Sequence, residues 1–334
     1  MMKHNHLQDL KQLLGAIAIV SPTAFSLAGQ VFHCQESAEG TAGQAQQPLV
    51  AQLQQALYAH SYVQRFNGRI HTLALATGPD ENLVQSLSQA NTSRERWERD
   101  WQIAQIAASG QIVAHKRSAT RTLWPGEFIA HDGPGVPARV GAQISIYAPR
   151  ESTAMQPGFY FAFGEAPAEP HDLYDSVRFY WNISDGGAAE LIGALTRLLN
   201  RFLVPFRLKC CNSRPLFYRL DSAVLYVPKR FCRITAELLV EIYPRLRSEL
   251  GGATPLFTRR LAPGLAFAEE PGTGESFGMF CCRVVAEAVW SSAAQGGQAR
   301  LEVVAERFRS YDIDIARPYL RSGSVNRYEF PAYA

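Results

Sequence analysis

The sequence predicts an α+β fold, in which an N-terminal helical cap precedes a mixed, largely antiparallel sheet with flanking helices. Two changes in hydrophobic period support this class. Apolar residues recur at helical spacing over roughly the first 90 residues, and from Trp97 onward they alternate with polar residues, as strands require. Helical spacing returns after Gly187. We therefore expect a helical region over residues 1–95 and an α+β domain over residues 96–334.

Three apolar stripes define the expected N-terminal helices, at Leu7 to Leu14, Leu49 to Tyr58 and Leu83 to Leu87. The small, polar segment from Cys34 to Pro48 separates the first two stripes and is expected to be a loop. The run LLGAIAIVSPTAFSLAG resembles the core of a signal peptide, but a Ser-Pro pair interrupts it and Asp9 precedes it where positive charge belongs. A cytoplasmic location is therefore expected.

Strand patterns fill the middle of the chain. WQIAQIA and QIVAHKR flank a Ser-Gly turn and predict a β-hairpin, and AQISIYAP, GFYFAFG and VRFYWNIS predict further strands. The Pro- and Gly-rich segment from Trp124 to Gly141 is expected to be a long ordered loop. After a helix that begins near Gly187, the runs PFRLKC and AVLYVP predict two more strands. Three helices should follow, from Phe231 to Leu250 and through CCRVVAEAVW and ARLEVVAERFRSY.

The bulk composition excludes several classes of protein. The chain has 334 residues, of which 47% are hydrophobic and 19% charged, as in an ordinary globular protein. Its net charge of +3 is too small for general nucleic-acid binding, and no apolar run approaches the roughly 20 residues of a membrane-spanning helix. The six cysteines include two vicinal pairs, whose side chains would point to opposite faces of a strand, so we expect buried thiols and no zinc site. We expect no cofactor, no nucleic acid and no membrane as a partner.

A block of basic residues runs from Arg197 to Arg233, where nine Lys and Arg side chains accompany one acid, Asp221. Lys209 is the unusual member, because the chain has 28 Arg but only five Lys. Clustered arginines require an anionic partner. A lysine held among them is a candidate base, since like charge lowers its pKa.

Strand alternation converts this block into a predicted site. In RFYWN one face carries Arg178, Tyr180 and Asn182, and in FRLKC one face carries Arg207 and Lys209. If the two strands are neighbours, one sheet face presents arginine forks, an amine, a hydroxyl and an amide, which together suit a phosphate. The alternative is a solvated face, or arginines paired with carboxylates from another element.

Other motifs are less specific. The turn EEPGTGESFG leads into a helix near Ser276 and offers backbone N–H groups to an anion, although Ser276 as a simple N-cap is an equal alternative. All eight histidines lie at or before His171, so a histidine acid would come from His115, His131 or His171. His131, in the loop GEFIAHDGPG, is the best placed of the three.

Long stretches of the chain resemble one protein family. The segments PGFYFAFG, RFYWNIS, VPFRLK, YRLDSAVLYV, PLFTRRLAPGLAFAEEPGTGESFG and ARPYLRSGS resemble the HopA-type family, which includes a type III effector of plant pathogens and many cyanobacterial and actinobacterial proteins. The resemblance covers residues from about Trp97 to Tyr328. It implies a fold similar to that of effector phosphothreonine lyases, and it leaves secretion as an effector open.

The resemblance also implies a reaction. Several bacterial relatives belong to gene clusters for ribosomally made peptides, beside a kinase-like protein, where the HopA-like protein is expected to eliminate phosphate from phospho-Ser or phospho-Thr. The implied substrate is a phosphorylated peptide or protein, and the implied partner is a kinase-like protein. Such a β-elimination needs a base, cations for the phosphate and an acid for the leaving oxygen.

These roles can be placed on the residues of this chain. Lys209 is the expected base, and the acid is expected to be His131 or Tyr160. Asp221 is expected to fix Arg219. Five side chains are expected to bind or orient the phosphate, namely Arg178, Tyr180, Asn182, Arg207 and Arg219.

One departure from the family pattern concerns the helix after ESFG, which in the family often continues with a His-Arg pair. This chain has Phe280 and Cys281 there, with Arg283 one turn along as a substitute phosphate ligand. If the pair supplies the acid or a phosphate clamp, this copy is impaired. The alternative function is a non-catalytic, effector-like module that docks a phosphorylated or acidic partner.

Overall fold

The computed structural model describes residues 6–34, 46–74, 78–116, 119–133, 136–173, 175–295 and 297–333. Within these ranges three antiparallel sheets combine with two groups of helices, which confirms the predicted α+β class. No described helix is both long enough and apolar enough to cross a bilayer.

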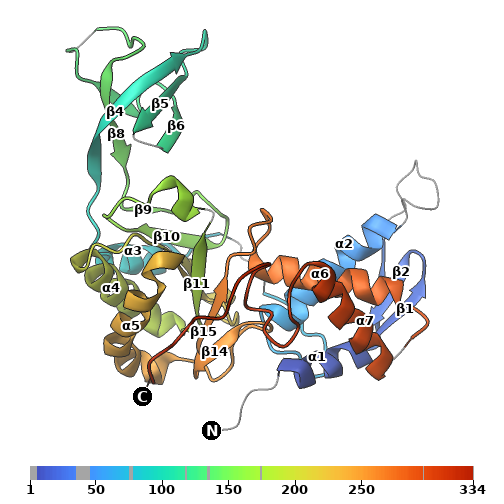
Figure 1. Ribbon diagram of the computed structural model, residues 1–334. Helices are drawn as coiled ribbons and strands as arrows, with labels where there is room; N and C mark the ends of the chain where they lie inside the picture. The colour runs from blue at the N-terminus through green and yellow to red at the C-terminus, as the bar shows by residue number, and fades with distance from the viewer. Residues whose placement is uncertain are drawn as a thin grey trace.

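A seven-stranded antiparallel sheet forms the centre of the molecule (Figure 1). The strands follow the order β14 (Arg259–Ala262), β15 (Leu265–Glu269), β11 (Ser176–Trp181), β13 (Ala223–Pro228), β12 (Arg207–Cys211), β10 (Phe159–Phe163) and β9 (Glu151–Ser152). The strands predicted in GFYFAFG, VRFYWNIS, PFRLKC and AVLYVP are confirmed. However, β11 and β12 are not neighbours, because β13 lies between them.

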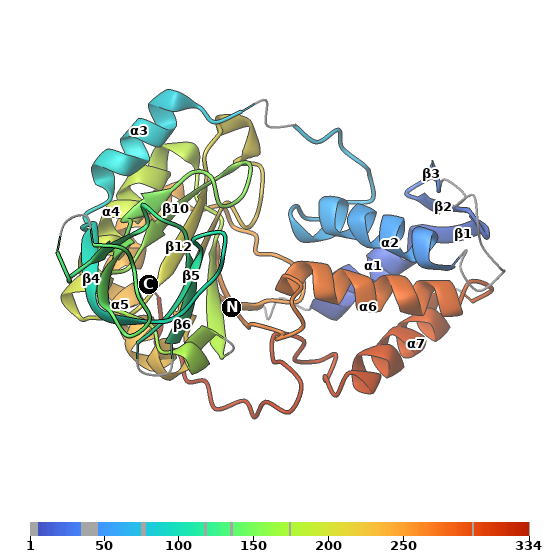
Figure 2. The same cartoon turned by 90° about the horizontal axis from the view of Figure 1, so that it is seen from above.

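Three helices cover one face of the central sheet, namely α3 (Glu81–Ala90), α4 (Asp185–Arg201) and α5 (Cys232–Leu246). Figure 2 shows them together on one side. Buried residues of α4 and α5, such as Leu195 and Leu239, share a core with alternate strand residues such as Phe179 and Leu225. This packing fixes which face of each strand is core, and so determines which face carries the basic residues.

Helices from both ends of the chain cover the other face. They are α1 (His6–Gly15), α2 (Gln46–Leu57), α6 (Phe277–Ser291) and α7 (Gly297–Ser310). A π-helical turn, η1 (Tyr58–Tyr62), continues α2 and packs Tyr62 edge-on against Tyr180 of β11. Gly278 of α6 permits this approach, because a Cβ there would lie 2.4 Å from the Tyr62 ring. These contacts bring the N-terminal region against the basic face of the sheet.

Part of the N-terminal region departs from the expected helices. The three predicted stripes do form α1, α2 and α3, but a small sheet lies between the first two: β1 (Ile17–Ser21), β2 (Ala24–Leu27) and β3 (Gln30–His33). Ala28 and Gly29 both have positive φ and close the tight turn from β2 to β3. The run that resembles a signal-peptide core is thus largely β-structure. Most of the expected loop from Cys34 to Pro48 lies outside the described residues.

A separate five-stranded sheet projects from the body (Figure 1). Its order is β6 (Ala119–Leu123), β5 (Ile112–Lys116), β4 (Arg96–Ile106), β8 (Gln143–Ala148) and β7 (Phe128–Ala130). The predicted hairpin is confirmed as β4 and β5, while the expected loop from Trp124 to Gly141 contains the short strand β7. This sheet has its own core around Trp101 and Ile144.

Candidate functional site

The basic face of the central sheet begins with a cross-strand row of three side chains. Arg178 of β11 is opposite Tyr226 of β13, which in turn is opposite Arg207 of β12. Both guanidinium groups stack on the Tyr226 ring. The distance from Cζ to the ring centroid is 4.9 Å for Arg178 and 4.5 Å for Arg207. Arg178 and Arg207 therefore belong to one cluster although β13 lies between their strands, because both contact the Tyr226 ring of β13.

The next row contains Lys209, opposite Val224 of β13 and Phe161 of β10. Lys209 is only 8% exposed, and its amine lies 3.7 Å from the centroid of the Phe159 ring. The amine makes no hydrogen bond or ion pair with the residues that the structure describes. Burial lowers the pKa of Lys209 to about 8, with a further lowering from the cations Arg219 and Arg178, while Asp221 opposes the shift.

Arg219 lies next to this amine and is firmly held. Asp221 accepts two hydrogen bonds from its guanidinium, at 2.9 and 3.0 Å, which confirms the expectation that Asp221 fixes Arg219. The hydroxyl of Tyr58, in η1, accepts a third at 3.1 Å. The Phe159 ring makes a cation–π contact with this guanidinium and another with the Lys209 amine.

The arginines of this face differ in their partners. Arg178 is 7% exposed and is paired with Glu270, whose carboxylate accepts from its Nε at 2.6 Å. Arg207 is exposed, and it forms no ion pair with any residue in the described part of the chain. Four cations thus face two carboxylates, and Arg207 and Lys209 carry the uncompensated charge.

Two of the predicted phosphate ligands are buried in other contacts. Tyr180 shares the face of Lys209 but is only 2% exposed, packed beneath Tyr62 and Phe277. Asn182 follows β11, where its side-chain amide donates to the carbonyl of Ala253 at 3.1 Å. Asn182 therefore anchors a loop, and the structure does not bring it to Lys209.

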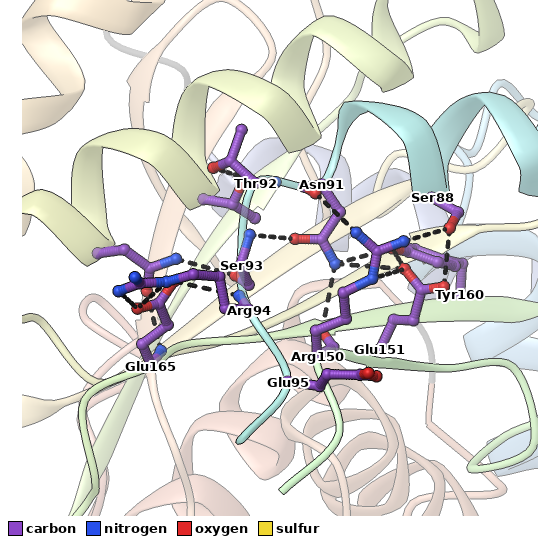
Figure 3. A network of polar contacts seen from close by, with 12 residues as sticks. Ser88, Asn91, Thr92, Ser93, Arg94, Glu95, Arg150, Glu151, Tyr160 and Glu165 are labelled. Atoms are coloured by element: carbon purple, nitrogen blue, oxygen red, sulfur yellow. Dashed lines mark hydrogen bonds and ion pairs between the residues drawn. The ribbon is translucent and has the colours of Figure 1, made fainter.

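Both residues predicted as the acid lie away from Lys209. Tyr160 is on β10 opposite Cys210, so its side chain points to the other face of the sheet. Figure 3 shows it in the polar network at the base of the projecting sheet, where it donates to Glu151 at 2.8 Å and accepts from Asn91 at 3.0 Å. His131 is on the projecting sheet itself, 2.8 Å from the Ser145 hydroxyl. Neither placement could be predicted from local sequence patterns, since each depends on long-range strand pairing.

The departure from the family pattern lies in α6. Phe280 and Cys281 are both buried in the helical core. Arg283 is bonded to Glu275 and Glu287, and none of its contacts is shared with Lys209. Ser276 caps the helix, its hydroxyl accepting from the N–H of Met279, as the simpler interpretation of this turn proposed.

Three aromatic residues of the site were not predicted. Tyr58 lies in the N-terminal region, where no site residue was predicted, and the π-helical turn that presents it is a local geometry often found at functional sites. Phe159 and Tyr226 could have been found from strand alternation once the strand order was known, because each shares its face with Lys209 or Arg207.

The geometry supports two kinds of chemistry. An uncompensated guanidinium binds an anion, and a buried amine with a lowered pKa accepts a proton near neutral pH. No group of three or more His, Cys, Asp or Glu side chains in the described ranges could hold a metal ion.

Comparison with known proteins places the chain in a family. Residues 150–320, about half of the chain, match the model of the HopA1 effector protein family. Similar solved structures include the effector protein from Pseudomonas syringae pv. tomato strain DC3000, with 15% identity and a TM-score of 0.43, and that from Pseudomonas syringae pv. syringae strain 61, with 17% and 0.40. Each comparison covers 84% of this chain and 99% of the other. No curated protein matched the chain.

Proposed function

This chain belongs to the HopA1 effector protein family, and from that premise we propose that it is a lyase that eliminates phosphate from phospho-Ser or phospho-Thr in a peptide or protein. The single observation that carries the proposal is the largely buried Lys209 side chain, whose amine has no hydrogen-bond partner in the described residues. A phosphorylated peptide is the substrate, and a kinase-like protein that phosphorylates it is the proposed partner.

The proposed reaction uses Lys209 as the base. The neutral amine takes the α-proton, the electron pair of the broken C–H bond forms the Cα=Cβ double bond, and the Cβ–O bond breaks. Phosphate leaves with the electron pair of that bond, and Lys209 is left as an ammonium that returns its proton to solvent. The products are a dehydroalanine or dehydrobutyrine residue and inorganic phosphate.

The pKa of Lys209 suits this role. With a value of about 8, a useful fraction of the amine is neutral near neutral pH, whereas an ordinary lysine is almost fully charged. Burial is the main cause of the shift, and the surrounding arginines add to it. The same arginines would attract the phosphate dianion of the substrate.

Arg207 is the proposed primary phosphate ligand, because it is exposed and unpaired within the described residues. Arg219 and Arg178 are already bonded to Asp221 and Glu270, so they would contribute mainly through their charge. Negative charge on the leaving oxygen is then met by guanidinium groups, and the roles first given to His131 and Tyr160 are left out of this proposal.

A second candidate function is a non-catalytic module that docks a phosphorylated or acidic partner. The observation that favours it is the pairing of Arg178 and Arg219 with carboxylates, which is typical of a structural network. In this case Arg207 would hold the anion and Lys209 would only add charge.

Incubation with phosphothreonine and phosphoserine peptides, followed by ³¹P NMR, separates the two candidates. The lyase releases inorganic phosphate, and Lys209→Met abolishes the release while Lys11→Met, which changes an exposed lysine of α1, does not. Binding of the peptides without any phosphate release would overturn the lyase and leave the docking module.

A further inference from the structure

Among the members of the basic block that lie outside the site around Lys209, three are close together in the sequence. Lys229 and Arg230 belong to the 3₁₀ turn η4 (Lys229–Phe231), and Arg233 is in the first turn of α5. Lys229 lies five residues beyond Val224, the partner of Lys209, which is about 17 Å along the strand. These residues therefore belong to a different part of the surface.

They form one wall of a groove of about 440 Å³. The opposite wall is the C-terminal segment, dark red in Figure 1, which crosses from the helices to α5. It contributes Arg321, Ser322, Ser324 and Arg327, together with the Tyr328 ring. Five cationic side chains line the groove and no acidic one does.

Two of the five cations have no counter-charge. Lys229 is paired with Glu269, Arg230 with Asp172 and Arg321 with Asp175. Arg233 and Arg327 are exposed and make no ion pair with the residues that the structure describes. They leave the groove with an excess of positive charge, and an excess of that kind attracts an anion.

The groove is held in shape by the buried carboxylate of Glu269, which is 1% exposed. It accepts hydrogen bonds from the Arg321 N–H at 2.8 Å and the Ser324 hydroxyl at 2.7 Å, and it contacts the Lys229 amine at 2.7 Å and the Tyr328 hydroxyl. Asp172 holds Arg230 by two hydrogen bonds. Both walls are thereby fixed before a ligand arrives, which lowers the entropic cost of binding.

We propose that this groove is a second anion site, which binds a phosphate group carried by a peptide. Guanidinium forks on both walls match the geometry of a phosphate better than that of a point anion. The volume accommodates a phosphorylated side chain with its neighbours, whereas a lone phosphate would leave most of it empty.

The test uses the full chain with Lys209→Met and Arg207→Gln, so that it depends neither on the proposed elimination nor on phosphate binding at the site around Lys209. A labelled phosphoserine peptide without acidic residues is titrated into this protein, its Arg233→Gln/Arg327→Gln variant and an Arg197→Gln/Arg245→Gln control. The control removes the same charge from exposed helix positions that have no partner within the described ranges.

The groove variant should bind at least tenfold more weakly, and the control within twofold of the parent. Inorganic phosphate should compete, but at a concentration at least tenfold higher than the unlabelled phosphopeptide. Equal losses in the two double variants would overturn the proposal, because they would show only a net-charge effect. Equal binding of the unphosphorylated peptide would overturn it as well.

Discussion

The amine of Lys209 lies over the ring of Phe159, 3.7 Å from its centroid, across the paired strands β12 and β10. The aromatic face stabilises the charged amine, but it replaces the hydrogen bonds that water would provide. Burial outweighs this contact, so the pKa falls to about 8. A pKa of this value suits the base of the proposed elimination.

The rate of phosphate elimination should depend on the charge of Lys209. The amine is protonated below its pKa of about 8 and neutral above it, so kcat/KM should rise roughly tenfold per pH unit below that value and level off above it. A pH–rate profile on a phosphothreonine peptide measures this. A rate that falls through the same range would exclude a neutral amine as the base.

The lowered pKa also predicts how stability responds to pH. The folded protein releases the Lys209 proton near pH 8 and the unfolded chain near 10.5, so the native state gains stability as pH rises between these values. Lys209→Met removes this dependence. The free energy of unfolding of Lys209→Met minus that of wild type, measured with urea, should therefore fall by about 2 kcal/mol from pH 7 to 9.5. A difference that does not change with pH would contradict the lowered pKa.

Measured in the Arg233→Gln/Arg327→Gln protein, so that the groove does not bind the peptide, Arg207→Gln should weaken phosphopeptide binding about tenfold, because it removes the unpaired guanidinium of the face. The residue is exposed, so the free energy of unfolding should change by less than about 0.5 kcal/mol. Calorimetric titration and urea unfolding measure the two effects. Arg197→Gln, on the exposed face of α4, is the control and should leave affinity unchanged.

Asp221→Asn should have two effects. It leaves the buried Arg219 without its carboxylate, which should cost about 3 kcal/mol of stability. It also removes the negative charge that raises the pKa of Lys209, so the midpoint of the pH–rate profile should move below 8. Asp314→Asn breaks an exposed pair with Arg317 and should cost under about 1 kcal/mol. Equal losses for the two variants would contradict the buried pair.

The sequence predicted most elements because their signals are local. Alternation in RFYWN and FRLKC predicted that Arg178 and Arg207 share a face if their strands are neighbours, and they share it although β13 lies between the two strands. Helical stripes located α1 to α7. The order of the strands depends on pairings between distant segments, so the insertion of β13 could not be read from either strand. The boundary near residue 95 stays a prediction.

The candidate site was predicted only in part for the same reason. The predicted part contains residues that are close in the sequence. Arg207 and Lys209 lie on the same face of β12, and Arg219 follows shortly after them and acts on the charge of Lys209. His131 and Tyr160 were chosen by residue type, and type does not determine on which sheet or face a side chain lies. Tyr58 reaches the site through the packing of η1 on the sheet, which has no local signature.

The mass of a phosphothreonine peptide after incubation with the protein tests the central claim most directly. Elimination by Lys209 predicts a product lighter by about 98 Da with the wild-type protein and an unchanged peptide with Lys209→Met. A product lighter by about 80 Da would indicate hydrolysis and contradict the account. So would the same loss of about 98 Da with Lys209→Met, because another residue would then be the base.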